Sequence, residues 1–117
     1  MAGETLMELE LELRETLKKY YENLTTYVKE IKDVVKKYDP SAKALIFGSV
    51  VKGYARPDSD VDVLVITEIA RNVSSRLMLR VEIARRVGVY TPFEIHIVTW
   101  EEYRSWYEKF IDKYEEV

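Results

Sequence analysis

The fold class predicted by the sequence is α/β (α+β), a small β-sheet covered by helices. Apolar residues recur every three or four positions near both ends of the chain, which is the period of an amphipathic helix. Between these ends lie three short apolar runs of strand length, the last two separated by another helical pattern. Because a chain of 117 residues buries a single core, we expect one domain over residues 1–117.

Composition excludes several classes of protein. Apolar residues make up 47% of the chain and charged residues 33%, an ordinary balance for a folded domain. A net charge of −3 offers no basic surface for long nucleic acids. The absence of cysteine excludes disulfides and thiolate metal sites. Since neither a signal-peptide pattern nor a membrane-spanning run occurs, we expect a cytoplasmic protein with no membrane partner.

The N-terminal segment, residues 1–38, is expected to be helical. Its apolar stripe consists of Leu6, Leu9, Leu13, Leu17, Tyr20, Leu24, Tyr27, Ile31, Val34 and Tyr38. Thr25 and Thr26 weaken the middle, so the pattern fits one long helix or two shorter ones, ended by Asp39-Pro40. An unbroken helix of about 50 Å exceeds what a small sheet covers, which leaves part of the stripe for a second copy or another protein.

Three strands are predicted within residues 43–98, which form the expected catalytic core. The first is "AKALIF", which ends before Gly48, the second covers residues 60–67, and the third is "FEIHIV" at residues 93–98. Residues 50–55 are expected to form a short helical turn after the first strand.

Two further helices complete the predicted order. One begins after a cap at Ser74 or Ser75 and ends before Gly88. Its core-facing residues are expected to be Leu77, Val81, Ala84 and Val87. The other is a closing helix within residues 99–117, with a Thr99–Glu102 capping box and an end near Tyr114. Its face of Trp106, Phe110 and Tyr114 is expected to pack in the core or against a partner.

Two aspartates stand at the start of the second strand, where an apolar run makes bare carboxylates costly. Side-chain alternation places Asp60 and Asp62 on one face, with Cα atoms about 6.5 Å apart, so their charges repel. A divalent cation would remove the conflict, and oxygen ligands without cysteine favour Mg²⁺ or Mn²⁺. The alternative is a pair that caps the strand end in solvent.

Gly48-Ser49, at the end of the first strand, fits a phosphate site. Glycine lets backbone N–H groups approach a phosphate closely, and the serine adds a hydroxyl donor. Lys52 and Arg56, four residues apart, would add positive charge to the same loop. A phosphate cradle beside a carboxylate pair suits nucleoside triphosphate chemistry, whereas a plain turn is the alternative.

The spacing of these features matches a known pattern. Gly48-Ser49, ten further residues, and then Asp60-x-Asp62 before an apolar strand resemble the signature of the DNA polymerase β nucleotidyltransferase superfamily. The segment "GSVVKGYARPDSDVDVLV" is similar to the minimal nucleotidyltransferases (MNT), whose usual form is roughly "GSxARGxARxxSDIDLxV". The matching positions are Gly48, Ser49, Lys52, Gly53, Ala55, Arg56 and Ser59 to Asp62, whereas Val51 and Tyr54 depart from the pattern.

The resemblance implies the polymerase β-like fold, with a mixed sheet flanked by helices, across about residues 35–100. It also implies metal-dependent nucleotidyl transfer from ATP by two Mg²⁺ or Mn²⁺ ions. The implied nucleotide-binding residues are Gly48, Ser49, Lys52, Arg56 and Ser59, and the implied catalytic metal ligands are Asp60, Asp62 and a third carboxylate.

Glu94 in "FEIHIV" is the candidate for that third carboxylate. The family more often has aspartate at this point, so the longer side chain changes the geometry. A solvent-facing glutamate on an edge strand is the alternative. His96 shares the face of Glu94 because side chains alternate, but we expect this single histidine to be a packed or surface residue.

The acceptor is expected to be a hydroxyl group. The minimal class resembles the antitoxin half of HEPN–MNT toxin–antitoxin pairs, which implies transfer of AMP to a tyrosine of a helical HEPN toxin. Two alternatives stay open: a small-molecule nucleotidyltransferase similar to the aminoglycoside enzymes, and a non-catalytic antitoxin module that only binds its partner.

Overall fold

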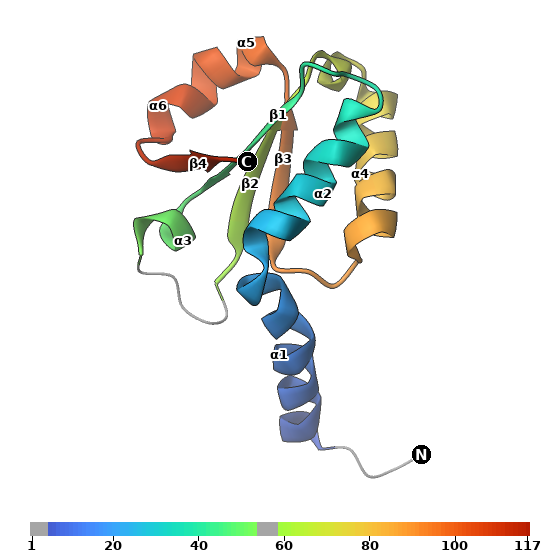
Figure 1. Cartoon of the computed structure of the whole chain (residues 1–117), viewed down its shortest axis with the longest axis vertical. Helices are drawn as coiled ribbons and strands as arrows, with labels where there is room; N and C mark the ends of the chain where they lie inside the picture. The colour runs from blue at the N-terminus through green and yellow to red at the C-terminus, as the bar shows by residue number, and fades with distance from the viewer. Residues whose placement is uncertain (1–4, 54–58) are drawn as a thin grey trace.

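The computed structural model describes residues 5–53 and 59–117 and contains a mixed four-stranded sheet (Figure 1). The strand order is β3-β2-β1-β4. The strands are β1 (Lys43–Phe47), β2 (Val61–Ile66), β3 (Phe93–Val98) and β4 (Tyr114–Glu116). β1 pairs antiparallel with both β2 and β4, whereas β2 pairs parallel with β3. The first three strands confirm the sequence prediction, and the mixed sheet confirms the fold class.

Helices cover both faces of this sheet (Figure 1). The helical elements are α1 (Leu6–Glu22), α2 (Leu24–Lys36), α3 (Ser49–Lys52), η1 (Glu68–Arg71), α4 (Val73–Val87), α5 (Trp100–Glu102), η2 (Tyr103–Tyr107) and α6 (Glu108–Phe110). α2 and α4 pack on one face, and the consecutive elements α5, η2 and α6 lie over the other (Figure 1). No helix of the described residues is long and apolar enough to cross a membrane.

Alternation along β2 divides the interior into two cores. Val61, Val63 and Val65 are fully buried in the core beneath α2 and α4. Leu64 and Ile66 point to the opposite face and join a smaller core with Tyr103 and Tyr107. Asp62 has the same parity as Leu64 and Ile66, so it begins the face that the C-terminal segment covers.

The N-terminal segment is two helices, separated at Asn23 rather than at the two threonines. Thr5 caps α1 in a capping box with Glu8. Most of α1 projects away from the sheet (Figure 1), and its last turn is fixed to the body by Tyr20. The buried Tyr20 hydroxyl donates to the carbonyl oxygen of Val87 at 2.6 Å.

The predicted cap of α4 was wrong, and of its predicted core face only Val87 is buried, with Ala84 partly buried. Asn72 is the N-cap, with its side chain accepting from the Ser75 backbone N–H, while Gly88 does follow the helix as predicted. The buried residues are Leu79, Ile83 and Val87, whereas Leu77 and Val81 are exposed by 59% and 50%. Two stripes of the helix have the spacing of a core face, and periodicity alone did not distinguish them.

The closing helix predicted to reach Tyr114 is shorter and less regular. The Thr99–Glu102 capping box is confirmed, but the segment contains a π-helical stretch and ends at Phe110. Residues 114–116 instead form β4, which pairs with the outer edge of β1. An unpaired edge leaves backbone groups unsatisfied, which favours strand over helix here.

The aromatic face of the closing segment is on the surface. Trp106 and Phe110 are exposed by 61% and 65%, and their rings contact each other at 5.2 Å between centroids. The core residue of this region is Ile111, which is only 8% exposed. Trp106 and Phe110 therefore do not pack in the core, and the other half of the prediction, packing against a partner, stays a prediction.

The assignment of the α4 core face gives a matched pair of variants. Leu79→Ala removes a fully buried side chain and should lower the free energy of unfolding by about 2–5 kcal/mol. Leu77→Ala removes an exposed side chain of the same helix and should change it by less than about 0.5 kcal/mol. Urea denaturation followed by circular dichroism measures both, and equal losses would contradict the assignment.

Candidate active site

The carboxylates predicted to act together lie opposite each other in the sheet. In the parallel register of β2 and β3, Asp62 is the partner of Glu94. In the antiparallel register of β1 and β2, Asp62 is the partner of Phe47. Asp62 therefore lies between the last residue of β1 and the second residue of β3, at one end of the sheet.

Asp62, Glu94 and His96 form a cluster whose candidate ligand atoms all lie within 4.8 Å of one another. The imidazole Nε2 of His96 is 3.8 Å from a carboxylate oxygen of Asp62 and 3.8 Å from one of Glu94. Asp62 and His96 are half-buried, whereas Glu94 is more exposed, at 56% of its side chain. The cluster combines two oxygen ligands with one nitrogen ligand.

His96 is held in place by aromatic rings. Its ring centroid is 5.8 Å from that of Phe47 and 5.7 Å from that of Tyr107, in the η2 segment. His96 is thus packed, in agreement with the sequence analysis, which did not predict that its ring also lies near both carboxylates. The two-residue spacing from Glu94 was the signal, since it puts both side chains on one face of β3.

Gly48 lies directly against the Asp62 carboxylate. A Cβ atom built at Gly48 would be 2.3 Å from Oδ2 of Asp62, a distance that no side chain tolerates. The backbone φ of Gly48 is +84°, which also favours glycine. The Gly-Ser turn and the second aspartate of the motif, 14 positions apart, therefore meet at the end of β1.

The other predicted site residues lie around this point. Ser49 is the first residue of α3, and Asp60 is exposed, one residue before β2 and outside the three-residue cluster. The Lys52 ammonium is 3.0 Å from a carboxylate oxygen of Asp112, in the C-terminal segment. The carbonyl oxygen of Ser59 accepts a hydrogen bond from the Tyr21 hydroxyl. The predicted nucleotide-binding residue Arg56 lies outside the described residues.

The charge of the cluster is unbalanced. Burial raises the pKa of the Asp62 carboxyl group, and the negative charge of Glu94 raises it further. His96 acts in the opposite direction on the same pKa but does not cancel the rise. Ionised Asp62 beside Glu94 is therefore unfavourable, and the charge of a bound cation would offset this cost.

The donor set fits a divalent cation. Carboxylate oxygens are the ligands that Mg²⁺ and Mn²⁺ prefer, whereas an imidazole nitrogen is more typical of Zn²⁺, iron or Ni²⁺. The pKa of Asp62 is raised first by burial and then by the charge of Glu94, and a bound cation would oppose both effects. Asp62, Glu94 and His96 can thus each offer one ligand atom to the same ion.

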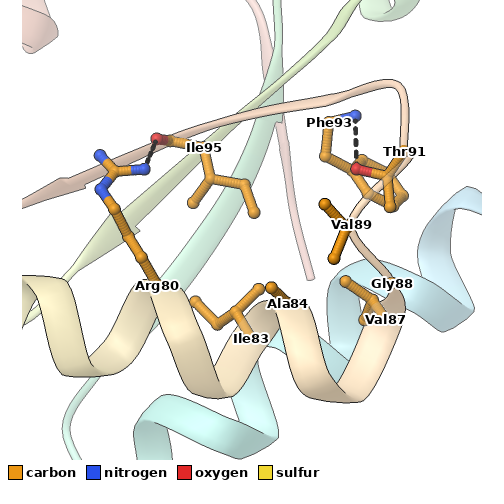
Figure 2. Close-up of a pocket in the computed structure, with 9 residues that line it drawn as sticks. All are labelled: Arg80, Ile83, Ala84, Val87, Gly88, Val89, Thr91, Phe93 and Ile95. Atoms are coloured by element: carbon orange, nitrogen blue, oxygen red, sulfur yellow. Dashed lines mark hydrogen bonds between the residues drawn. The ribbon is translucent and has the colours of Figure 1, made fainter.

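A groove between α4 and β3 is a separate feature (Figure 2). It is lined by Arg80, Ile83, Ala84, Val87, Gly88, Val89, Thr91, Phe93 and Ile95. Arg80 crosses it and donates to the carbonyl oxygen of Ile95 at 2.9 Å, which satisfies a group on the edge strand (Figure 2). Phe93 and Ile95 face away from Glu94 and His96, so the groove opens on the other side of β3.

Comparisons with known proteins agree with this arrangement. The nucleotidyltransferase domain family matches residues 28–116. A crystal structure of a "putative nucleotidyltransferase" shows 33% sequence identity and a TM-score of 0.63, and the match covers 76% of this chain and 95% of the other. A second such structure, from Sulfolobus solfataricus, shows 20% identity and a TM-score of 0.48, with coverage of 81% and 82%. No curated protein matches the chain.

The chain belongs to the nucleotidyltransferase domain family, because the match spans most of its length. This places it in the transferase class and confirms the broad family predicted from the spacing of Gly48-Ser49 and Asp60-x-Asp62. The family match begins at residue 28, so it includes the sheet and most of α2 but not α1.

The close approach of Gly48 to Asp62 predicts a coupling between the two positions. Gly48→Ala should lower the free energy of unfolding by more than about 1 kcal/mol, through backbone strain and the clash with Oδ2. In an Asp62→Ala background only the backbone strain is left, so the cost should fall by at least about 1 kcal/mol.

Gly53→Ala is the control for backbone strain alone, because Gly53 has a φ of +85° and nothing within 4 Å of a built Cβ. Its cost should be the same in both backgrounds. Chemical denaturation of the wild type, the three single variants and the two double variants measures the coupling. An equal cost of Gly48→Ala with and without Asp62 would contradict the contact.

The raised pKa of Asp62 predicts a pH dependence of stability in metal-free buffer. Between the usual and the raised pKa the folded protein binds more protons than the unfolded chain, so this carboxyl group contributes stability at low pH. That contribution is lost as pH rises through the folded pKa. Asp62→Asn should therefore be more stable than the wild type at pH 7, and the difference should shrink as the pH is lowered.

Thermal denaturation with chelator across an acidic-to-neutral pH series compares the two proteins. Using the difference between them removes the contributions of other carboxyl groups, such as Asp39 and Glu102, whose pKa values are lowered. A difference that grows toward acid pH would show that the Asp62 pKa is lowered instead.

Proposed function

We propose that this protein transfers a nucleoside monophosphate, AMP from ATP, to a hydroxyl group of a partner protein. The observation that carries the proposal is the contact of Gly48 with Asp62 beside Glu94 and His96. It brings the turn expected to bind phosphate and the carboxylates expected to hold metal to one end of the sheet. The family match supplies the class of reaction.

The triphosphate would bind at the turn between β1 and α3. Gly48 and Ser49 would offer backbone N–H groups and a hydroxyl, with Lys52, Arg56 and Ser59 completing the site. To bind the triphosphate, Lys52 would have to break its ion pair with Asp112. Because Asp112 is 72% exposed, breaking this pair costs little.

The carboxylates would hold two divalent ions, Mg²⁺ or Mn²⁺. Asp60 and Asp62 would bind the ion that accompanies the triphosphate, and Glu94 would share a second ion with Asp62. Such ions supply neutralisation of the triphosphate charge and a lower pKa for the acceptor hydroxyl. Asp62 fits the shared position, because it is half-buried and is the partner of Glu94 in the sheet register.

The acceptor oxygen would attack the α-phosphorus in line with the leaving group. A bond forms from this oxygen to phosphorus, the bond to the β-phosphate oxygen breaks, and pyrophosphate leaves. Glu94 is exposed enough to meet an acceptor from solvent, and through the second ion it would lower the pKa of the acceptor hydroxyl, whose proton would pass to solvent. Positioning of the hydroxyl supplies much of the rate, which gives a docked partner a direct catalytic role.

The C-terminal segment offers the surface for this partner. Trp106 and Phe110 are exposed aromatic residues, and Tyr107 between them contacts His96 of the cluster. A protein bound over these rings would lie next to the carboxylates. We propose that the partner is the helical HEPN toxin of an MNT antitoxin pair.

The proposal predicts a covalent product on the partner. After incubation of this protein with a helical HEPN protein, ATP and Mg²⁺, mass spectrometry should find AMP added to a tyrosine, serine or threonine of the HEPN protein. Asp62→Asn should abolish the adduct, because it removes a charge from the cluster. Asp33→Asn, an exposed aspartate of α2, is the matched control and should keep full activity.

A stable complex without an adduct under any nucleotide would instead support a module that acts only by binding. An adduct on an aminoglycoside or another small alcohol, with none on the protein, would support the small-molecule alternative.

A further inference from the structure

The first helix is an addition to the family domain. The family match begins at residue 28, whereas α1 covers Leu6–Glu22. α1 runs outward from the sheet (Figure 1) and contacts the body through its last turn, where Tyr20 is buried. In its last turn the Tyr21 hydroxyl donates to the carbonyl oxygen of Ser59, a residue of the proposed nucleotide site, whereas the proposed nucleotidyl transfer gives no role to the residues before that turn.

The projecting part of α1 carries an apolar surface. The exposed fractions are 76% for Leu6, 71% for Met7, 48% for Leu9, 56% for Leu11 and 49% for Leu13. A helix of 17 residues is marginal in water unless tertiary contacts stabilise it. Exposed leucines in such number mark a surface that another protein covers.

One face of the helix has the geometry of a seam. Leu9, Leu13 and Leu17 follow one another at intervals of four residues, on the same side as the buried Tyr20. Leu11 lies on the opposite side, since each residue turns the helix by roughly 100°. The seam is symmetric about Leu13.

We propose that the seam binds α1 of a second copy of this chain, in an antiparallel pair with its two-fold axis at Leu13. In this register Leu13 meets its own counterpart, and Leu9 meets Leu17 of the other copy. A symmetric pair uses the same patch on both chains, as homodimers do.

Charge on the flanks of the seam selects the antiparallel direction. Glu10 and Glu12 flank its first half, whereas Arg14 and Lys19 flank its second half. A parallel pair would set glutamates against glutamates at one end and cations against cations at the other. In the antiparallel pair Glu10 meets Arg14, and Lys19 comes within reach of Glu12. Flanking charges of this kind determine orientation in paired helices.

The ends of the seam continue onto the body. In the proposed register Leu6 of one copy lies opposite Tyr20 of the other, where the loop after α4 begins. Tyr20 is hydrogen-bonded to Val87, and the loop exposes Val89 by 78% and Tyr90 by 77%. Because Tyr20 is itself buried, the first turn of each helix would contact the exposed Val89 and Tyr90 of the partner's body rather than Tyr20.

Single cysteines test the register in the full-length protein, because the natural chain has none. Under mild oxidation Leu13→Cys should form a covalent dimer rapidly, since the two residues meet at the axis. Leu6→Cys should not, because in the antiparallel pair its counterpart lies at the far end of the helix. Rapid crosslinking of both variants would overturn the antiparallel direction, and crosslinking of neither would overturn the pair.

Sedimentation of the wild type and variants tests the surface. The wild type should dimerise reversibly, and Leu9→Glu with Leu13→Glu should weaken the dimer at least tenfold without changing the circular dichroism spectrum. Leu11→Glu is the matched control on the outer face and should leave the dimer intact. A monomeric wild type at millimolar concentration, or an equal effect of Leu11→Glu, would overturn the proposal.

A charge exchange tests the pairing of the flanks. Glu10→Lys should weaken the dimer, and the addition of Arg14→Glu should restore it, because the two positions then carry opposite charges again. Failure of the second change to restore dimerisation would overturn the proposed contact. A wild type that stays monomeric alone but binds a different helical protein through Leu9 and Leu13 would assign the seam to that protein instead.

Discussion

The carboxylate of Asp62 is the point on which the arrangement of this domain depends. Its strand is buried on the other face, which fixes the backbone, and the parallel register with β3 puts Glu94 alongside. Gly48 closes the third side so tightly that a Cβ atom there would be 2.3 Å from the Asp62 Oδ2. The register of the sheet thus places the two carboxylate-bearing residues directly beside each other.

The two cores of the fold position β2 and leave the end of the sheet at Asp62 partly exposed. The core under α2 and α4 anchors β2 through valines that are fully buried. On the opposite face the C-terminal segment covers Leu64 and Ile66, whereas Asp62, further along the same face, is only partly buried. Tyr107 of that segment and Phe47 of β1 hold the His96 ring, so its nitrogen reaches both carboxylates.

Three of the strands and the family were predictable from sequence because they depend on short-range patterns. Apolar runs with period-two alternation gave β1, β2 and β3, and the spacing of Gly48 and Asp62 gave the family. What failed depends on contacts distant in sequence. β4 forms because β1 has a free edge, and a three-residue strand has no pattern of its own. The face of α4 is chosen by the shape of the core, since both of its stripes satisfy the helical period. The place of His96 in the cluster depends on its ring contacts with Phe47 and Tyr107, which lie far from it in the sequence or on another element.

The most direct test of the account is calorimetric titration of Mn²⁺ with ATP into the full-length protein. The wild type should bind with millimolar or better affinity, and ligand binding should raise its melting temperature by mass action. The double variant Asp60→Asn with Asp62→Asn should lose both the heat of binding and the temperature shift while keeping its fold. Unchanged binding in that variant would contradict the claim that these carboxylates hold the metal and the nucleotide.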